Sequence, residues 1–384
     1  MSRQLSEEHE ELRRTVATFS REVVAPVIGD YYEREAFPYD IVAQMGAMGL
    51  FGLPFPESYG GMGGDYFALC LALEELARVD SSVAITLEAG VSLGAMPIFR
   101  FGSELQRQTW LPRLCSGEAL GAFGLTEPHC GSDAGRIRTT ARLAEETWVV
   151  NGTKSFITNS GTDITALVTV TAVTGTLPDG RPEISAILIP RDTPGLSVGQ
   201  KYSKVGWSAS DTNELILDEC QVPEDNLVGE RGRGYAQFLR ILDEGRIAIA
   251  ALSVGLAQGC VDESLAYAGQ REAFGATIGG HQAIQFKLAD MAARVHTARL
   301  AYYDAAQRML AGEPFKKEAA IAKLVSSNAA MDNAREATQI FGGSGFMNES
   351  AVGRFYRDAK ILEIGEGTSE IQRMLIAREL GLPA

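Results

Sequence analysis

The chain has 384 residues, of which 45% are hydrophobic and 22% are charged. A chain of this length can form two or three domains and bury roughly three quarters of its unfolded surface. Its formal net charge of −14 disfavours nucleic acid and anionic membranes as partners, although local arginines can still hold an anionic cofactor.

The five cysteines provide no framework for disulfides or for zinc. They are odd in number, far apart and not arranged in CxxC or Cys/His pairs, so we expect no metal site. The N-terminus has the polar pattern of an amphipathic helix rather than of a signal peptide. No uninterrupted apolar run reaches the ~18 residues of a membrane span. These features predict a cytoplasmic protein that does not enter a membrane.

Residues 6–116 have a helical pattern of apolar side chains. Leu12, Val16 and Phe19 recur at intervals of three or four residues, and residues 67–79 form a second amphipathic run. We predict an all-helical domain over residues 1–118.

The pattern then changes to that of strands. Three runs are rich in β-branched and other strand-forming residues: 164–173, 183–189 and 213–222. The dipeptide Asn151-Gly152 is typical of a hairpin turn. Hairpins without intervening helices indicate an antiparallel rather than a parallel sheet. We predict a β-domain over residues 119–230.

Long helical segments return in residues 231–384. Glycine or proline separates four predicted helices: 236–270, 281–311, 314–340 and 349–382. Long helices with short links predict an antiparallel four-helix bundle. The expected fold class is therefore α+β and multidomain: an N-terminal helical domain, a middle antiparallel β-domain and a C-terminal four-helix bundle.

The segment 364–372, IGEGTSEIQ, combines a carboxylate with a helix start. Glu366 stands between two glycines, which permit a tight turn and a close approach by a flat ligand. The hydroxyl and acidic residues that follow suit the free N–H groups of a helix N-terminus, which also bind phosphate. The segment is a candidate base beside an anion site; the alternative is a helix cap with a solvated glutamate.

Four further stretches have both a chemical and an ordinary structural interpretation. Residues 121–133 are rich in small, hydroxyl and acidic residues and lie at a domain junction. They would form either a binding loop or a simple linker. Phe156 and Thr158 are expected on one strand face, where they would bind a planar heterocycle or only pack. Arg271 would bind phosphate or simply end a helix. The glycines of residues 339–358 would either let a ligand approach the backbone closely or only end one helix before the next begins.

Together these stretches resemble the acyl-CoA dehydrogenase family over nearly the whole chain. Residues 124–133, GLTEPHCGSD, match the family's first signature except at Cys130, where a smaller residue is usual. Residues 339–358 match the second signature throughout, and REAFG and EGTSEIQ follow the family's order. From residue 242 onward the sequence is most similar to the short-chain and short-branched-chain members.

The resemblance implies the cofactor FAD and a homo-oligomer, typically a tetramer. The residues that correspond to FAD contacts are Phe123, Leu125, Thr126, Gly131, Ser132, Phe156, Ile157, Thr158, Arg271, Phe274, Gln282, Gln339, Gly342, Gly343, Thr368, Ser369 and Glu370. Phe156 stands where the family usually has Trp, which keeps a stacking ring but loses an N–H donor. Arg271, Gln282 and residues 339–343 correspond to positions that reach the FAD of the neighbouring subunit.

The resemblance also implies the reaction. Glu366 falls on the family's catalytic base, which removes the α-proton of an acyl-CoA thioester while the β-hydrogen leaves as hydride to flavin N5. The product would be a trans-2-enoyl-CoA. The positions that match substrate contacts are Ser132, Asp243, Arg246 and Gly367. In some members the catalytic base stands at a position that is Gly245 here. Because glycine has no side chain that could act as a base, Glu366 is the candidate that remains.

Two departures from the family bear on this interpretation. Gly365 replaces a common Tyr, which either widens the acyl pocket for a branched or bulkier chain or leaves a space that a neighbour fills. His129 beside Cys130 permits a catalytic dyad, and the ordinary alternative is a loop residue that faces solvent or the flavin edge.

The expected function is FAD-dependent α,β-dehydrogenation of a short or short-branched acyl-CoA, in fatty acid β-oxidation or branched-chain amino acid catabolism. An electron-transferring flavoprotein is the expected partner. The alternatives are an acyl-CoA oxidase and a catalytically silent subunit of the same fold. An NAD-dependent Rossmann enzyme is disfavoured, because Gly-Arg-Gly at 232–234 lacks the third glycine and the βαβ context. The acyl chain and its carrier, CoA or an acyl carrier protein, stay open.

Overall fold

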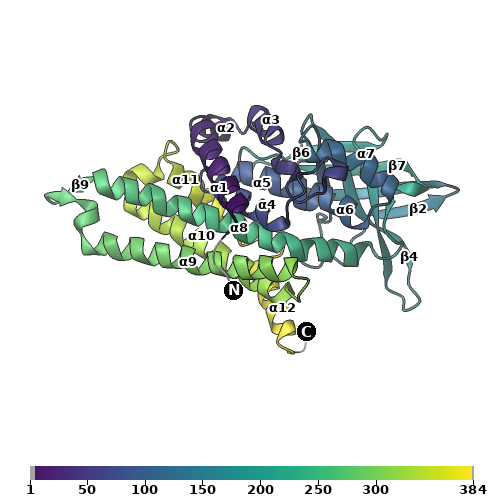
Figure 1. Ribbon diagram of the computed structural model, residues 1–384. Helices are drawn as coiled ribbons and strands as arrows, with labels where there is room; N and C mark the ends of the chain where they lie inside the picture. The colour runs from purple at the N-terminus through teal and green to yellow at the C-terminus, as the bar shows by residue number, and fades with distance from the viewer. Residues whose placement is uncertain (1–4, 383–384) are drawn as a thin grey trace.

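The computed structural model describes residues 5–382, and Figure 1 shows a sheet at one end of the molecule and long helices reaching the other. The N-terminal helices are α1 (Glu7–Phe19), η1 (Ser20–Val24), α2 (Ile28–Glu33), α3 (Tyr39–Ala47), η2 (Leu50–Gly52), η3 (Glu57–Tyr59), α4 (Tyr66–Ala77), α5 (Ser81–Glu88), η4 (Ala89–Ala95), α6 (Met96–Phe101) and α7 (Glu104–Cys115). Every residue of α4 and α5 is buried, so these two helices form the centre of the region. The predicted helical region is therefore present.

The middle region is one eight-stranded sheet. Its strands are β1 (Leu120–Gly124), β2 (Thr140–Ala144), β3 (Thr147–Thr158), β4 (Thr165–Thr176), β5 (Pro182–Pro190), β6 (Leu196–Lys201), β7 (Thr212–Pro223) and β8 (Leu227–Val228). The order is β6-β7-β3-β2-β4-β5-β8, with β1 paired to β4. Most neighbours are antiparallel, as predicted, but β1 and β2 each pair with β4 in parallel.

The predicted hairpin turn at Asn151-Gly152 is wrong. Both residues lie inside β3, and the turn between β2 and β3 falls at residues 145–146, where Glu145 has a φ of 54°. The register of β3 against β7 shifts between Val150 and Gly152, which marks a bulge. A glycine within a strand is typical of such a bulge.

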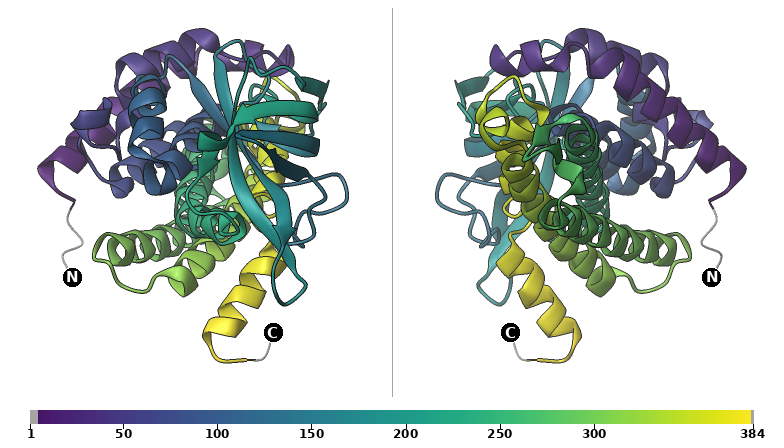
Figure 2. Two further views of the ribbon diagram at one scale, coloured as in Figure 1. Left: turned by 90° about the vertical axis from the view of Figure 1, so that its right-hand side faces the viewer. Right: turned by 90° about the vertical axis from the view of Figure 1, so that its left-hand side faces the viewer.

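The C-terminal region contains α8 (Gly234–Gln270), α9 (Gln282–Leu310), α10 (Lys316–Phe341), α11 (Ala351–Leu362) and α12 (Ser369–Glu379). Between α8 and α9 lies a two-stranded hairpin, β9 (Glu272–Ala273) and β10 (Ala276–Thr277), followed by the short helix η6 (Ile278–Gly280). Figures 1 and 2 show α8, α9 and α10 side by side, while α12 projects from the body. The predicted single helix over 349–382 is wrong, because left-handed residues separate α11 from α12.

Two segments, Ser81–Phe101 and Gly234–Gln270, are long and apolar enough to cross a membrane. Of their most apolar windows, 89% and 83% are buried inside the protein, as in core helices of a folded domain. Polar residues interrupt both segments, so neither contains an uninterrupted apolar run of the length of a membrane span. Their hydropathy is weak support for a membrane span, and the cytoplasmic location stays a prediction.

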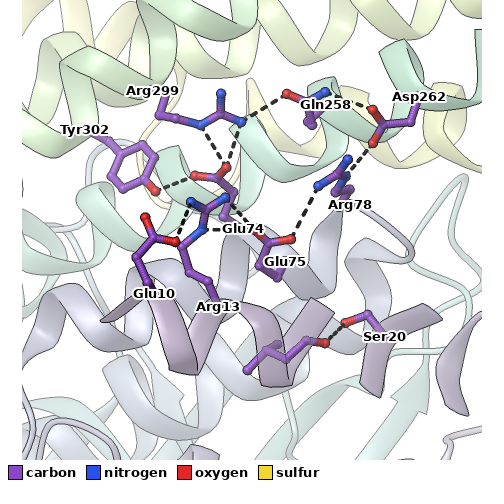
Figure 3. A network of polar contacts seen from close by, with 11 residues as sticks. Glu10, Arg13, Ser20, Glu74, Glu75, Arg78, Gln258, Asp262, Arg299 and Tyr302 are labelled. Atoms are coloured by element: carbon purple, nitrogen blue, oxygen red, sulfur yellow. Dashed lines mark hydrogen bonds and ion pairs between the residues drawn. The ribbon is translucent and has the colours of Figure 1, made fainter. Parts of the chain in front are cut away.

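A polar network joins the N-terminal helices to the bundle (Figure 3). Glu74 on α4 accepts a hydrogen bond from Tyr302 on α9 and pairs with Arg299 at 2.7 Å. The next residue, Glu75, pairs with Arg13 of α1 at 2.8 Å. Both glutamates are buried, so loss of Arg299 would leave the Glu74 charge without its cation, whereas Glu75 also pairs with Arg78 at 3.6 Å. The network therefore fixes α1 and α9 against α4.

A second buried acid connects all three regions. Asp358 on α11 accepts hydrogen bonds at 2.7 Å from the hydroxyls of Tyr32 on α2 and Ser81 on α5. It also accepts one at 2.7 Å from the backbone N–H of Trp207, which lies between β6 and β7. The Asp358 carboxylate is 0% exposed. One side chain of the bundle thus holds α11 to both other regions.

Replacement of Asp358 by Asn is expected to lower the free energy of unfolding by roughly 2–4 kcal/mol, because an amide NH₂ would face groups that themselves donate. Denaturant titration measures this loss. Asp192→Asn, at an exposed position, is the matched control and should change stability by less than about 0.5 kcal/mol. Equal, small changes in both variants would show that Asp358 does not join the regions.

Candidate active site

Glu366 lies in the tight turn between α11 and α12. Its φ is 51° and that of Gly367 is 93°, so both residues are left-handed, a costly conformation for a glutamate. A Cβ atom placed on Gly245 of α8 would lie 2.6 Å from Oε2 of Glu366. The glycine therefore gives the carboxylate room to lie against α8. This Oε2 is buried and makes no hydrogen bond within residues 5–382.

Two side chains hold the turn through the carbonyl of Gly367. Lys323 on α10 and Gln372 on α12 each donate a hydrogen bond to it at 2.8 Å. Lys323 is 0% exposed, and burial lowers its pKa to about 8. The sequence prediction missed Lys323. The available signal was a lone lysine on the alanine-rich buried face of α10.

Burial and the neighbouring groups shift the pKa of Glu366 in opposite directions. Burial raises the pKa of Glu366, while Glu88, Lys323 and Arg246 act to lower it. A carboxylate with a raised pKa and a free buried oxygen is suited to accept a proton. The geometry therefore supports Glu366 as a base rather than as a solvated helix cap.

The predicted helix start after Glu366 is present. Thr368 is the N-cap of α12, and its hydroxyl accepts a hydrogen bond from the N–H of Ile371 at 3.3 Å. The hydroxyl of Ser369 is buried and makes no hydrogen bond in the described part of the chain, whereas Glu370 is exposed. A free hydroxyl at a helix N-terminus is available to a polar ligand.

Three of the predicted substrate contacts gather at this turn. Gly367 is part of it, and Arg246 and Asp243 lie on α8, where they form an ion pair. Arg246 is 4% exposed and lies close enough to Glu366 to lower its pKa. The fourth contact, Ser132, lies in the exposed loop after β1.

The loop after β1 contains the first group of predicted FAD contacts. Phe123 and Leu125 are buried, and the ring of Phe123 stacks on Phe238 of α8 at 3.9 Å. Thr126 is half-buried, while Gly131 and Ser132 are exposed. A Cβ atom on Gly131 would meet no atom within 4 Å, so a ligand can approach its backbone.

A buried ion pair fixes this loop to the sheet. Lys154 of β3, 0% exposed, donates to Glu127 at 2.8 Å and to the carbonyl of Leu125 at 3.4 Å. Burial raises the pKa of Glu127, but the effect of Lys154 and further donors is larger, so the pKa is lowered overall. Beside this pair, the N–H of Ser155 donates to the carbonyl of Thr126 at 2.9 Å. The sequence prediction included neither member of the ion pair.

Phe156, Ile157 and Thr158 lie at the end of β3. The register against β7 shifts between Lys154 and Ile157, and Phe156 has a φ of 61°. The bulge means that strand alternation alone does not place Phe156 and Thr158 on one face, so their shared face stays a prediction. Phe156 is nevertheless 63% exposed and Ile157 is buried, so the aromatic ring is accessible.

The second group of predicted FAD contacts lies at the opposite end of the molecule. Arg271, Phe274, Gln282, Gln339, Gly342 and Gly343 are all exposed. Tyr267 stacks on Phe341 at 4.1 Å, which brings the end of α8 beside the end of α10. Figure 1 shows β9 there, far from the sheet. The chain therefore does not bring the two groups together.

Three family models match the chain in sequence order. They describe the N-terminal domain of acyl-CoA dehydrogenase over residues 6–118, its middle domain over 122–220 and its C-terminal domain over 232–381. The chain belongs to the acyl-CoA dehydrogenase family.

Relatives and solved structures agree over the full length. The chain is 48% identical to the probable acyl-CoA dehydrogenase YngJ of Bacillus subtilis (strain 168), covering 99% of this chain and 100% of that one. It is 39% identical to butyryl-CoA dehydrogenase from Megasphaera elsdenii, with a TM-score of 0.95 and coverage of 99% and 100%. A glutaryl-CoA dehydrogenase from Mycobacterium smegmatis in complex with FADH2 is 31% identical, with a TM-score of 0.93 and coverage of 99% and 96%.

These matches confirm the predicted family, its three-domain fold class and its class as a flavoprotein oxidoreductase. The domain bounds predicted at residues 118 and 230, and the roles of the individual site residues, stay predictions.

His129 and Cys130 of this acyl-CoA dehydrogenase do not form an evident reactive dyad. The His129 ring makes a hydrogen bond with the carbonyl of Arg136 at 3.0 Å, and burial raises the pKa of the Cys130 thiol. Both lie near Glu127, whose carboxylate Lys154 already neutralises. The arrangement is that of a structured loop, the ordinary alternative given above.

Lys154→Met is expected to lower the free energy of unfolding by about 3–5 kcal/mol, because it leaves the buried Glu127 carboxylate unpaired. Thermal and denaturant unfolding measure the loss. The double variant Lys154→Met, Glu127→Leu removes both charges and should recover part of it. Single and double variants of equal stability would show that the ion pair is not the cause.

Proposed function

We propose that this protein is an FAD-dependent dehydrogenase that converts a short or short-branched acyl-CoA thioester to its trans-2-enoyl-CoA. The observation that carries the proposal is the buried, unbonded carboxylate oxygen of Glu366 at the end of a fixed turn. The α-proton of a thioester is weakly acidic, so its removal requires a positioned base with a raised pKa. Glu366 has both properties.

Three features of the site would support proton removal by Glu366. Lys323 and Gln372 hold the Gly367 carbonyl and so position the base. The backbone N–H of Glu366 would donate to the thioester oxygen, on which negative charge develops. Binding of the acyl chain would exclude water and raise the pKa of Glu366 further.

The residues present fit FAD. The exposed ring of Phe156 can stack on a flat heterocycle, and the open backbone at Gly131 and the free Ser369 hydroxyl offer polar contacts. When bound, FAD supplies the acceptor for the β-hydride. Phe123, Leu125, Thr126, Ile157 and Thr158 would complete the flavin side of the site.

The second group of contacts would complete the cofactor site of another subunit. Arg271 and Gln282 would bind its phosphates, with Phe274, Gln339, Gly342 and Gly343 around them. Because this group lies at the far end of the same chain, one chain cannot surround one FAD (Figure 1). We therefore propose a homo-oligomer, a tetramer by family resemblance.

The substrate class rests on the pocket and on relatives. A Cβ atom on Gly365 would have only ordinary contacts, with its nearest neighbour, the carbonyl oxygen of Ile361, at 3.4 Å. Nothing crowds the first atom of a side chain at this position, which is compatible with a wider acyl pocket and room for a branch. The relative from Megasphaera elsdenii is named for butyryl-CoA. An electron-transferring flavoprotein would reoxidise the enzyme.

Glu366→Gln is expected to keep bound FAD yet slow flavin reduction by butyryl-CoA by roughly 100- to 10,000-fold, because an amide cannot accept the proton. Anaerobic mixing with butyryl-CoA, followed by flavin absorbance, measures the rate. Glu363→Gln, three residues earlier, is the matched control and should react normally. Normal reduction in Glu366→Gln would rule out Glu366 as the base, and rapid reoxidation of the wild type by oxygen would favour an acyl-CoA oxidase.

Arg271→Met should weaken FAD binding about tenfold, because it removes one charge-assisted hydrogen bond to phosphate. The flavin-to-protein ratio after dialysis measures this change. Arg181→Met, on an exposed loop of the sheet region, serves as control. Full flavin retention in Arg271→Met would contradict the shared cofactor site.

A further inference from the structure

Lys323 of α10 is a buried cation without an ion-pair partner. Its side chain lies on the alanine-rich buried face of α10 and is 0% exposed. Within residues 5–382 its ammonium group forms no salt bridge, and it donates its hydrogen bond to the carbonyl of Gly367 at 2.8 Å. Burial of a charge that is neither paired nor solvated is costly, so a lysine at this position requires a reason beyond packing.

Holding the turn does not require that charge. Gln372 of α12 donates to the same carbonyl at the same distance, 2.8 Å, through a neutral amide. Gln372 is also 0% exposed, so the carbonyl already has a buried donor. What Lys323 adds is a positive charge, bound to the residue that follows Glu366.

The charged groups that face Lys323 come from the turn and from three helices. After burial, the groups that shift its pKa are, in order of effect, Glu366, Arg246, Glu363 and Glu370. Glu363 already pairs with Lys360 at 2.7 Å, and Glu370 is exposed to solvent. The charge of Lys323 therefore acts mainly on Glu366, whose Oε2 is buried.

Glu366 has a competitor for its negative charge. Glu88 at the end of α5 is 0% exposed, and a Cβ atom on Gly245 would lie 3.8 Å from Oε1 of Glu88 and 2.6 Å from Oε2 of Glu366. Two adjacent carboxyl groups in a buried space do not both ionise readily. Burial, and then Glu366, raise the pKa of Glu88 well above its usual value. A cation on the side of Glu366 therefore decides which acid carries the charge.

Lys323 is the cation whose charge is available for this purpose. Burial raises the pKa of Glu366, and Glu88, Lys323 and Arg246 lower it. Arg246 forms an ion pair with Asp243, so much of its charge is already neutralised. Lys323 has no such partner in the described part of the chain.

We propose that Lys323 is a positioning residue that keeps Glu366, rather than Glu88, ionised before the substrate binds, so that the site contains a base at neutral pH. Its consequence for catalysis rests on the proposed function, because it takes Glu366 as the base. Lys323 does not touch the substrate. It acts through its charge on the side chain that removes the proton.

A double-mutant cycle on stability tests the charge interaction without any turnover. Lys323→Met in the FAD-loaded protein removes the cation beside an ionised Glu366 and should lower the midpoint of urea unfolding. In a Glu366→Gln background the same change removes a costly buried charge and no partner, so the midpoint should fall less or rise. Equal shifts in both backgrounds would overturn the interaction.

The pH dependence of flavin reduction by butyryl-CoA tests the consequence for the base. At low thioester concentration, the rate constant divided by the dissociation constant reports groups of the free enzyme. In Lys323→Met the acid limb should move upward by about one pH unit, which lowers the rate about tenfold on that limb. Because the pKa of Lys323 is about 8, its charge is lost above that value, and the wild type and the variant should converge there.

Three replacements separate the charge from the hydrogen bond. Lys323→Gln keeps a neutral donor for the Gly367 carbonyl, so it would restore the wild-type profile if Lys323 only held the turn. We expect Lys323→Gln to behave like Lys323→Met, whereas Lys323→Arg keeps the cation and should retain the profile. Lys316→Gln, at an exposed position of α10, is the matched control.

The outcomes separate the two proposals. An unshifted acid limb in Lys323→Met, or a wild-type profile in Lys323→Gln, would overturn the role of the charge. If Lys323→Met alone does not fold, recovery of folding in the double variant with Glu366→Gln supports the interaction, and no recovery overturns it. If butyryl-CoA reduces the wild-type flavin at no pH, the proposed dehydrogenation is wrong, and the unfolding cycle still decides whether Lys323 keeps Glu366 ionised.

Discussion

The active-site turn depends on the anchoring of α11 by Asp358. This buried carboxylate binds groups from the N-terminal helices and from the sheet region, so α11 cannot shift against either. The helix ends at Leu362, four residues before Glu366. On the other side of the turn, Lys323 and Gln372 hold the Gly367 carbonyl. A left-handed glutamate, which costs roughly 1–2 kcal/mol, is maintained because the chain is fixed on both sides.

The same burial that positions Glu366 sets the charges around it. Removal from water raises the pKa of the acids Glu366 and Glu88 and lowers the pKa of Lys323 to about 8. Each shift favours a neutral group, and the attraction between Lys323 and Glu366 opposes both shifts at once. Two adjacent buried acids beside a buried lysine respond to any ligand that displaces water or adds a donor, because each change alters the balance between burial and charge attraction. In the proposed reaction, proton removal therefore depends on how burial and these few charges balance at Glu366.

Local sequence patterns predicted most helices and strands. Contacts between residues far apart in the sequence determine the features that these patterns did not predict. Apolar periodicity found α4 and α8 to α10, and the residue types after Glu366 predicted the Thr368 cap. The Asn151-Gly152 turn failed because pairing of β3 with β7 converts the glycine into a bulge. Lys154, Lys323 and Glu88 escaped notice because their partners lie 27 or more residues away. The resemblance found Glu366 through its motif, but only the fold shows the neighbouring groups.

In our proposal, the distribution of the predicted cofactor residues connects subunit assembly with catalysis. Phe274 is 97% exposed and left-handed, a conformation and an environment that one chain alone does not favour. Nearby, Phe286 and Phe346 are 60% and 86% exposed. Apolar side chains beside Arg271 and the glycines at 342 and 343 suit a surface that a partner subunit and its cofactor cover together. In our proposal, FAD binding and subunit association then stabilise each other, because the ligand binds an arrangement that only the oligomer provides. A variant at this end would therefore lose flavin without any change near Glu366.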